Sequence, residues 1–206
     1  MDRTARAGAE ARQTPRLVLV GLAVVIATII GTLGDQSVSS SATSFGDVLR
    51  DRRGALGEAD GLVIDSASVF DDAIPAVANL DPSLLKALRR AATDAAKDGV
   101  EFQVNSGWRS AEYQEQLLRE AVSEYGSEEE AARWVATANT SAHVSGDAVD
   151  IGPFDATAWL SEHGAHYGLC QIYRNESWHY ELRPEATSRG CPRMYADPTQ
   201  DPRMQQ

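Results

Sequence analysis

The chain has 206 residues, enough for one domain of ordinary size together with an anchor or a tail. Apolar residues make up 43% of it and charged residues 24%, so it can form both a core and a soluble surface. The net charge of −11 argues against nucleic acid as a partner, because phosphate binding requires a basic face.

An uncharged apolar run occupies residues 17–33. Its length is at the lower limit for crossing a bilayer and slightly long for the apolar part of a signal peptide. Four arginines lie within residues 1–16, which places that end in the cytoplasm and the rest of the chain outside. No small-x-small cleavage site follows. We therefore predict a single-pass membrane anchor; if the segment is cleaved instead, the domain is secreted.

Residues 34–61 are predicted to be a linker. Their first part is polar and rich in serine and has no means of building a core; residues 45–61 are charged and interrupted by glycines, and we expect weak order there. We expect the folded domain over residues 62–196 and a C-terminal tail at residues 197–206.

The first strong helix is predicted at residues 82–98. Asp81 is a good N-cap, Gly99 suits the C-terminal stop, and leucines and alanines fall on one face at helical spacing. The alternating residues 100–105 then predict a strand.

Later elements are shorter. Ser110 is expected to cap a helix that runs to about Tyr125, and Ser127 a further helix that carries Trp134. Asp155 is expected to cap a helix at residues 156–163. Strands are predicted at residues 148–151, 168–173 and 178–182. The order indicates an α+β fold in which a small antiparallel sheet carries the functional site and helices flank it, preceded by the transmembrane helix.

Cys170 and Cys191 are the two cysteines of the chain. An even pair in an exported protein predicts a disulfide, which would stabilise the fold by about 3 kcal/mol in the chain-entropy model. Ligation of zinc by the thiolates is the alternative, but the pair lacks the short CxxC spacing.

Two segments, residues 141–150 and 176–179, offer metal ligands. His143, Asp150 and His179 supply two imidazoles and a carboxylate, which leave one position of a tetrahedral zinc open, as in a catalytic site. Glu176 is the residue type that takes a proton from zinc-bound water. Spacing alone leaves other interpretations open: a surface histidine, a turn aspartate and a sheet histidine that never meet.

The joint pattern resembles the zinc D-alanyl-D-alanine carboxypeptidases and dipeptidases of the VanY type. Three ordered motifs carry the resemblance. SxHxxGxAxD is matched by Ser141, His143, Gly146, Ala148 and Asp150; ExxH by Glu176 and His179, with Trp178 before the histidine; and SG[WY]RS by residues 106–110, followed by Gln114.

The resemblance implies roles for these residues. His143, Asp150 and His179 would bind one zinc ion per chain, Glu176 would be the catalytic base, and Arg109 would assist at the substrate carbonyl. Candidate substrate contacts are Ser141, Gln114, Trp108 and Tyr173. A turn-capping role explains Ser141 equally well, and the two aromatic side chains either wall the substrate pocket or pack in the core.

The function that the resemblance implies is a membrane-anchored, extracytoplasmic zinc peptidase. It would act on peptidoglycan stem peptides, and the reaction we expect is removal of a C-terminal D-alanine. A cut between L-Ala and D-Glu, or at an L,D-linkage, is open within the same family. A non-catalytic zinc-containing cell-wall binding domain is the rival from another class, and the presence of both Glu176 and Arg109 speaks against it.

Overall fold

The computed structural model of the chain describes residues 56–205. Across that range, no helix combines the length and the apolar character that a bilayer crossing requires. The predicted cytoplasmic N-terminus and anchor, residues 1–16 and 17–33, lie outside the described residues. Of the predicted linker, the part from residue 56 onward is described.

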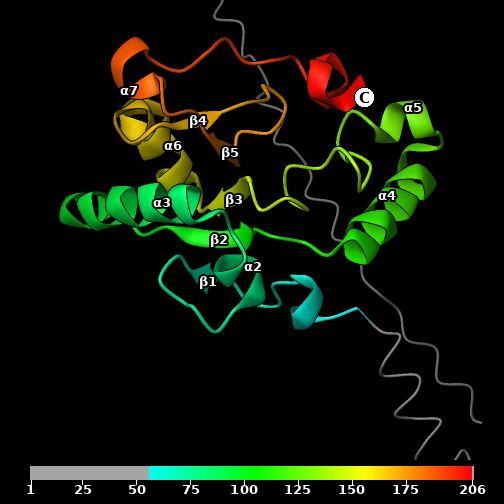
Figure 1. Cartoon of the computed structure of the whole chain (residues 1–206), viewed down its shortest axis with the longest axis horizontal. Helices are drawn as coiled ribbons and strands as arrows, with labels where there is room; N and C mark the ends of the chain where they lie inside the picture. The colour runs from blue at the N-terminus through cyan, green and yellow to red at the C-terminus, as the bar shows by residue number, and fades with distance from the viewer. Residues whose placement is uncertain (1–55, 206) are drawn as a thin grey trace, which may run out of the picture. The chain divides into compact units, whose positions relative to one another are not determined.

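An antiparallel sheet of five strands carries the domain (Figure 1). Its order is β1-β2-β3-β5-β4, and every neighbouring pair is antiparallel. The strands are β1 (Ala67–Ser68), β2 (Gln103–Ser106), β3 (Ala148–Gly152), β4 (Leu169–Gln171) and β5 (His179–Leu182). All residues of the central strand β3 are buried, because both of its faces are covered. The predicted α+β fold with a small antiparallel sheet is confirmed.

Helices lie on both sides of this sheet in the view of Figure 1, with α3, α6 and α7 on the left and α4 and α5 on the right. The α-helices are α2 (Pro75–Ala78), α3 (Pro82–Ala95), α4 (Ala111–Tyr125), α5 (Glu128–Ala131), α6 (Phe154–His163) and α7 (Ala186–Arg189). Short 3-10 helices are η1 (Glu58–Asp60), η2 (Ala96–Asp98), η3 (Gly164–Tyr167), η4 (Pro198–Gln200) and η5 (Pro202–Gln205).

The hydrophobic core forms where α3 and α6 pack against the sheet. Its largest fully buried apolar side chains are Val69, Val77, Leu84, Leu88, Val104, Val149, Ile151, Leu160, Leu169 and Tyr180. Burying one leucine side chain of this kind stabilises the fold by about 1.5–3 kcal/mol. The core therefore holds β3 and β5, the two strands that carry site residues, in a fixed register.

Most of the predicted helix signals are confirmed. The Asp81 carboxylate accepts hydrogen bonds from the backbone N–H of Ser83 (2.8 Å) and Leu84 (3.1 Å), as an N-cap does. The α-helix ends at Ala95 and tightens into η2 before Gly99, which has a positive φ of 77°. Ser110 caps α4 through the N–H of Tyr113.

Two helix predictions were wrong in detail. Asp155 is not the N-cap of α6: the helix begins at Phe154, directly after Pro153, so that Asp155 lies in the first turn. There its charge still favours the positive end of the helix dipole. The helix after Ser127 ends at Ala131, short of Trp134, whose ring stacks on Tyr125 of α4 at 6.0 Å between centroids.

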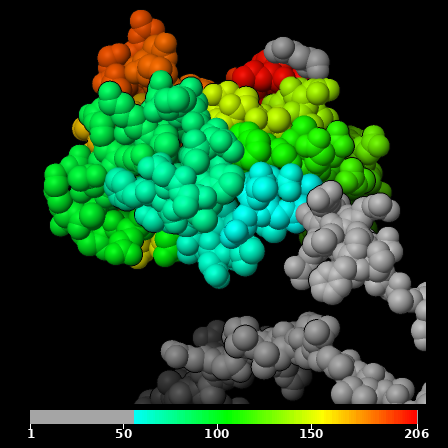
Figure 2. All heavy atoms as spheres, turned by 60° about the horizontal axis from the view of Figure 1, so that its bottom comes forward, coloured from blue at the N-terminus to red at the C-terminus, as the bar shows by residue number. Residues whose placement is uncertain are grey.

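Both ends of the described chain are bonded to the domain. Asp60 of η1 accepts hydrogen bonds from the backbone N–H (2.8 Å) and the hydroxyl (3.1 Å) of Ser110. In Figure 2, the segments up to and including α3, coloured cyan to green, make up most of the visible face of the domain. We call residues 197–205 the C-terminal segment; its Asp197 and Asp201 are buried. The predicted disulfide Cys170–Cys191 is present and ties the chain leading to this segment to β4.

Gly146 offers a test of this packing. It has a positive φ of 79°, and an added Cβ would lie 2.6 Å from the carbonyl oxygen of Asn79. Gly126 has a similar φ of 83°, but nothing lies within 4 Å of its Cβ position. Gly126→Ala should lower the free energy of unfolding by about 1–2 kcal/mol, the cost of the left-handed conformation. Gly146→Ala should cost about 1–3 kcal/mol more, because backbone must move. Urea denaturation measures both, and equal losses would contradict the packing described.

Candidate metal centre

Three separate elements bring the candidate ligands together. Asp150 in β3 and His179 in β5 lie directly opposite each other in the register of the sheet. His143 lies in the loop before β3, and its carbonyl accepts a hydrogen bond from the backbone N–H of Arg109 (3.2 Å). Farther along the same loop, the carbonyl of Gly146 accepts one from Asp81 (2.9 Å). The segment after β2 and the N-cap of α3 thus hold this loop in place.

The ligand atoms of these residues converge on one point. His143 Nε2 lies 3.2 Å from His179 Nδ1 and 3.4 Å from Asp150 Oδ1, and His179 Nδ1 lies 3.3 Å from Asp150 Oδ1. All three side chains are buried. Zinc ligands about 2.0–2.1 Å from the ion lie roughly 3.3 Å apart at the corners of a tetrahedron. The spacing therefore fits a zinc ion.

Each imidazole has one nitrogen that faces the metal position and one that faces away from it. The hydrogen-bond partner of the nitrogen that faces away fixes the tautomer of the ring. His143 Nδ1 lies 2.8 Å from the carbonyl oxygen of Gly107, which can only accept, so Nδ1 donates and Nε2 keeps its lone pair. His179 Nε2 lies 3.3 Å from Oε1 of Glu181, which leaves the lone pair of Nδ1 inward. Two lone pairs and a carboxylate oxygen that point at one another are stabilised by a metal cation or by a proton between them.

The pKa values reflect this arrangement. Burial, together with the nearby positive charge of Arg109, lowers the pKa of His143 and so favours the neutral ring. Burial also opposes a charge on His179, but hydrogen bonds to Asp150 and Glu181 outweigh it and raise the pKa of His179 to about 9. A proton therefore competes with a metal ion for the Nδ1 lone pair of His179.

Glu176 lies beside the ligand set without belonging to it. Its Oε2 is 3.7 Å from His179 Nδ1, and its Oε1 is buried with no hydrogen-bond partner among residues 56–205. Burial raises the pKa of Glu176 to about 7. A general base needs a pKa near the working pH and an oxygen free to accept a proton, and Glu176 has both.

Arg109 is fixed by three hydrogen bonds. It donates to Ser106 Oγ (2.8 Å), Gln114 Oε1 (3.1 Å) and Asp150 Oδ2 (3.0 Å). A guanidinium has five N–H donors, so two remain for a substrate. Because Arg109 occupies Oδ2 of Asp150, the other oxygen, Oδ1, is directed toward the imidazoles.

A cavity of about 430 Å³ opens onto these residues. Of the predicted substrate contacts, Ser141, Gln114 and Tyr173 line it, whereas Trp108 is not part of the lining. Both polar atoms of Gln114 are already bonded, since its Nε2 donates to the carbonyl of Ala136 (2.8 Å). Gln114 therefore orients Arg109.

Other residues of the lining were not among the predicted contacts. Three partly exposed aromatic side chains, Tyr125, Trp134 and Trp178, border the cavity, and Pro198 and Met204 of the C-terminal segment complete it. Trp178 lies within the ExxH motif, so its place in the cavity lining could have been predicted from the sequence. The sequence of the C-terminal segment contains no motif that predicts such a place for Pro198 or Met204.

Comparisons with known proteins agree with this geometry. The family model VanY, D-alanyl-D-alanine carboxypeptidase, matches residues 77–185, and the chain belongs to this family. A D-alanyl-D-alanine carboxypeptidase of Enterococcus faecalis (strain ATCC 700802 / V583) is 34% identical over 113 residues, which cover 42% of each chain. The chain thus spans less than half the length of this curated relative.

Two solved structures are similar in fold. VanYB in complex with D-alanine-D-alanine is 29% identical, with a TM-score of 0.50 over 53% of this chain and 75% of that one. The LD-carboxypeptidase LdcB is 23% identical, with a TM-score of 0.50 over 65% of this chain and 73% of that one.

The metal centre predicts a sharp difference among the four histidines of the chain. His143→Ala and His179→Ala should each lose bound zinc, since two ligands cannot hold a stable tetrahedral site. His163→Ala is the matched control, because its side chain is 45% exposed on α6 and lies outside the ligand cluster. Metal analysis of the purified chains should give about one zinc for the wild type and for the control. Full zinc in either ligand variant would refute the centre.

Proposed function

We propose that this chain is a zinc-dependent peptidase that hydrolyses peptidoglycan stem peptides and removes their C-terminal D-alanine. The observation that carries the proposal is Glu176: a buried carboxylate with an unpartnered oxygen, beside a metal ligand set, inside a cavity. A binding module with structural zinc needs neither this carboxylate nor a fixed arginine. Membership in the family and similarity to a structure that holds D-alanine-D-alanine support the choice of substrate.

His143, Asp150 and His179 would hold the metal. When bound there, zinc supplies a Lewis acid that polarises the scissile carbonyl and lowers the pKa of a water molecule. Two imidazoles and a carboxylate do not select zinc by affinity alone, so we expect this ligand set to accept other divalent ions in vitro.

Glu176 handles the protons of the reaction. Its unpartnered Oε1 accepts a proton from water as the water oxygen attacks the scissile carbonyl carbon. When the carbon–nitrogen bond then breaks, the same carboxyl returns that proton to the departing amine of D-alanine. The pKa of about 7 lets Glu176 serve as base and then as acid near neutral pH.

Arg109 stabilises the negative charge that develops on the carbonyl oxygen. Its hydrogen bonds to Ser106, Gln114 and Asp150 fix the guanidinium before the reaction, so no reorganisation is needed as the charge forms. Ser141 lies in the cavity lining, and in this proposal its hydroxyl binds the peptide.

For the location of the protein, the proposal is a membrane-anchored domain outside the cytoplasm. The apolar run at residues 17–33 and the arginines before it support an anchor of that orientation. The disulfide between Cys170 and Cys191 also supports export, because such bonds persist in oxidising compartments.

The function is tested with a pentapeptide that ends in D-Ala-D-Ala and the purified full chain. Free D-alanine should be released, a chelator should abolish its release, and added zinc should restore it. Turnover that survives complete removal of metal would contradict a metallopeptidase. Mass spectra of digested muropeptides separate this cut from cleavage at an L,D-linkage or between L-Ala and D-Glu.

The base is tested by Glu176→Gln, which keeps the side-chain volume and removes the proton acceptor. We expect bound zinc to remain and the turnover rate to fall by about 10²–10⁴-fold. Glu162→Gln, at a side chain that is 78% exposed on α6, makes the same chemical change outside the site and should leave the rate unchanged. Normal turnover by Glu176→Gln would show that another group accepts the proton.

A further inference from the structure

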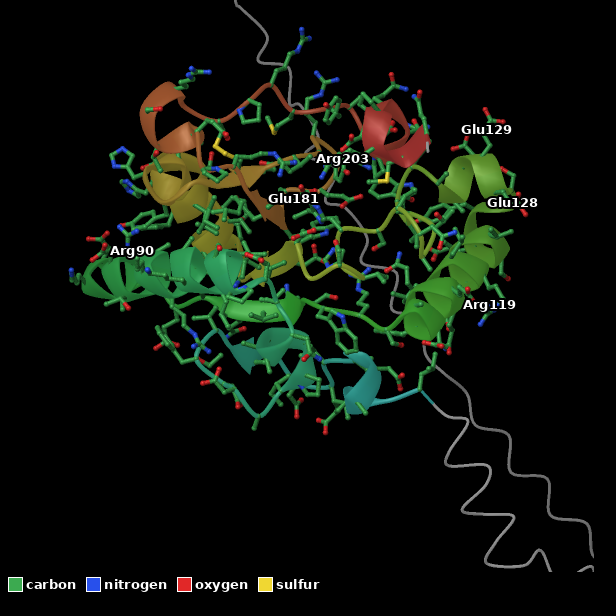
Figure 3. The ribbon with its side chains drawn as sticks, viewed as in Figure 1. Arg90, Arg119, Glu128, Glu129, Glu181 and Arg203 are labelled. Carbon is green, nitrogen blue, oxygen red and sulfur yellow. A yellow bond between two sulfur atoms is a disulfide. The ribbon has the colours of Figure 1, made fainter. Side chains whose placement is uncertain are left out.

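Arg203, in the C-terminal segment, binds the side chain of Glu181 in β5. Its Nη1 donates to Glu181 Oε2 (2.7 Å) and its Nη2 to Oε1 (3.0 Å), a two-pronged pair that fixes the carboxylate plane. Figure 3 shows the two labelled side chains close together, with Arg203 coming from the last segment of the chain. Glu181 is completely buried, whereas the side chain of Arg203 is 40% exposed, so the arginine covers the carboxylate from the solvent side.

The carboxylate that Arg203 fixes is the partner of a metal ligand. Glu181 Oε1 lies 3.3 Å from His179 Nε2, and this same oxygen accepts from Nη2 of Arg203. Arg183 also binds Glu181, but only at the other oxygen, Oε2 (2.6 Å). Of these two arginines, Arg203 is therefore the one that sets the position of the oxygen facing His179.

Arg203 is itself held in place on its other side. Asp201, which is completely buried, accepts hydrogen bonds from the Nε of Arg203 at 3.1 and 3.0 Å. The hydroxyl of Tyr173 donates to Asp201 Oδ2 (3.0 Å), and the Tyr173 ring lies 5.1 Å from the ring of His179. The contacts thus run from Tyr173 through Asp201, Arg203 and Glu181 to His179.

We propose that Arg203 is a positioning residue for the metal centre, which orients the His179 ring through Glu181 and keeps Nδ1 directed at the metal. This inference rests on the metal site of the proposed function. It extends that site to a segment beyond residues 77–185, the range that matches the family. A buried carboxylate behind a histidine ligand raises its basicity and fixes its tautomer, and loss of such a partner weakens metal binding.

A purely structural role would require only positive charge next to Glu181 and Asp201. Arg203→Lys separates the two possibilities, because lysine keeps the charge but cannot form the two-pronged pair. We expect Arg203→Lys to bind Zn²⁺ about 10-fold more weakly and Arg203→Gln about 100-fold more weakly than the wild type. The unfolding temperature of metal-free Arg203→Lys should fall less than that of Arg203→Gln, because lysine keeps the positive charge next to Glu181 and Asp201.

The measurement is competition between the full chain and a chelator for Zn²⁺ alone, with no substrate present. Absorption spectra of the Co²⁺-loaded chains provide a second readout, and the visible bands should shift in Arg203→Lys. Arg193→Gln is the matched control: this exposed arginine lies in the same stretch after the disulfide, and its variant should bind zinc as the wild type does.

Wild-type zinc affinity and spectrum in Arg203→Lys would overturn the proposal, as would equal weakening in Arg193→Gln. If Arg203→Gln does not fold, Arg203→Lys alone decides. A wild-type chain that binds no zinc would refute the metal centre and this inference together. A wild-type chain that binds zinc but releases no D-alanine would refute the proposed activity alone, since the affinities are measured without substrate.

Discussion

The site depends on one electrostatic constraint: two imidazole lone pairs and a carboxylate oxygen face one another in a buried space. Each ring is fixed by the acceptor behind it, the Gly107 carbonyl for His143 and the Glu181 carboxylate for His179. With both outer nitrogens donating, the inner ones cannot satisfy each other, and a cation or a proton must lie between them. The ligand set is therefore prearranged by hydrogen bonds that never touch the metal position.

Asp150 couples the metal position to the arginine beside it. One oxygen of this carboxylate faces the imidazoles, and the other accepts a hydrogen bond from Arg109. Interactions with His143 and His179, together with the positive charge of Arg109, outweigh the effect of burial and hold the pKa of Asp150 well below its usual value. Any displacement of Asp150 would move the ligand and the guanidinium together, so the two parts of the site share one geometry.

The helix ends could be predicted because their signals are local: the Asp81 side chain caps one end of α3, and Gly99 adopts a positive φ after the other. The ligand set was predicted from three motifs of a known family, since spacing alone did not decide whether His143, Asp150 and His179 meet. The ion pair between Arg203 and Glu181 could not be predicted, because Arg203 lies in an irregular segment without a repeating sequence pattern that would indicate its partner. The hydrogen bonds of Gln114 to Arg109 and to the Ala136 carbonyl could not be predicted either, because the folded chain alone determines which groups face its side chain.

Gly107 shows how a helix remote from the chemistry controls a ligand. A Cβ on Gly107 would lie 2.1 Å from the carbonyl oxygen of Ala76 in α2, the same oxygen that accepts a hydrogen bond from the N–H of Trp108. Any side chain at this position would push the segment after β2 away from α2. The Gly107 carbonyl, which holds the ring of His143, would move with that segment. A glycine at position 107 therefore keeps its carbonyl oxygen next to Nδ1 of His143, and this oxygen fixes the tautomer of the imidazole.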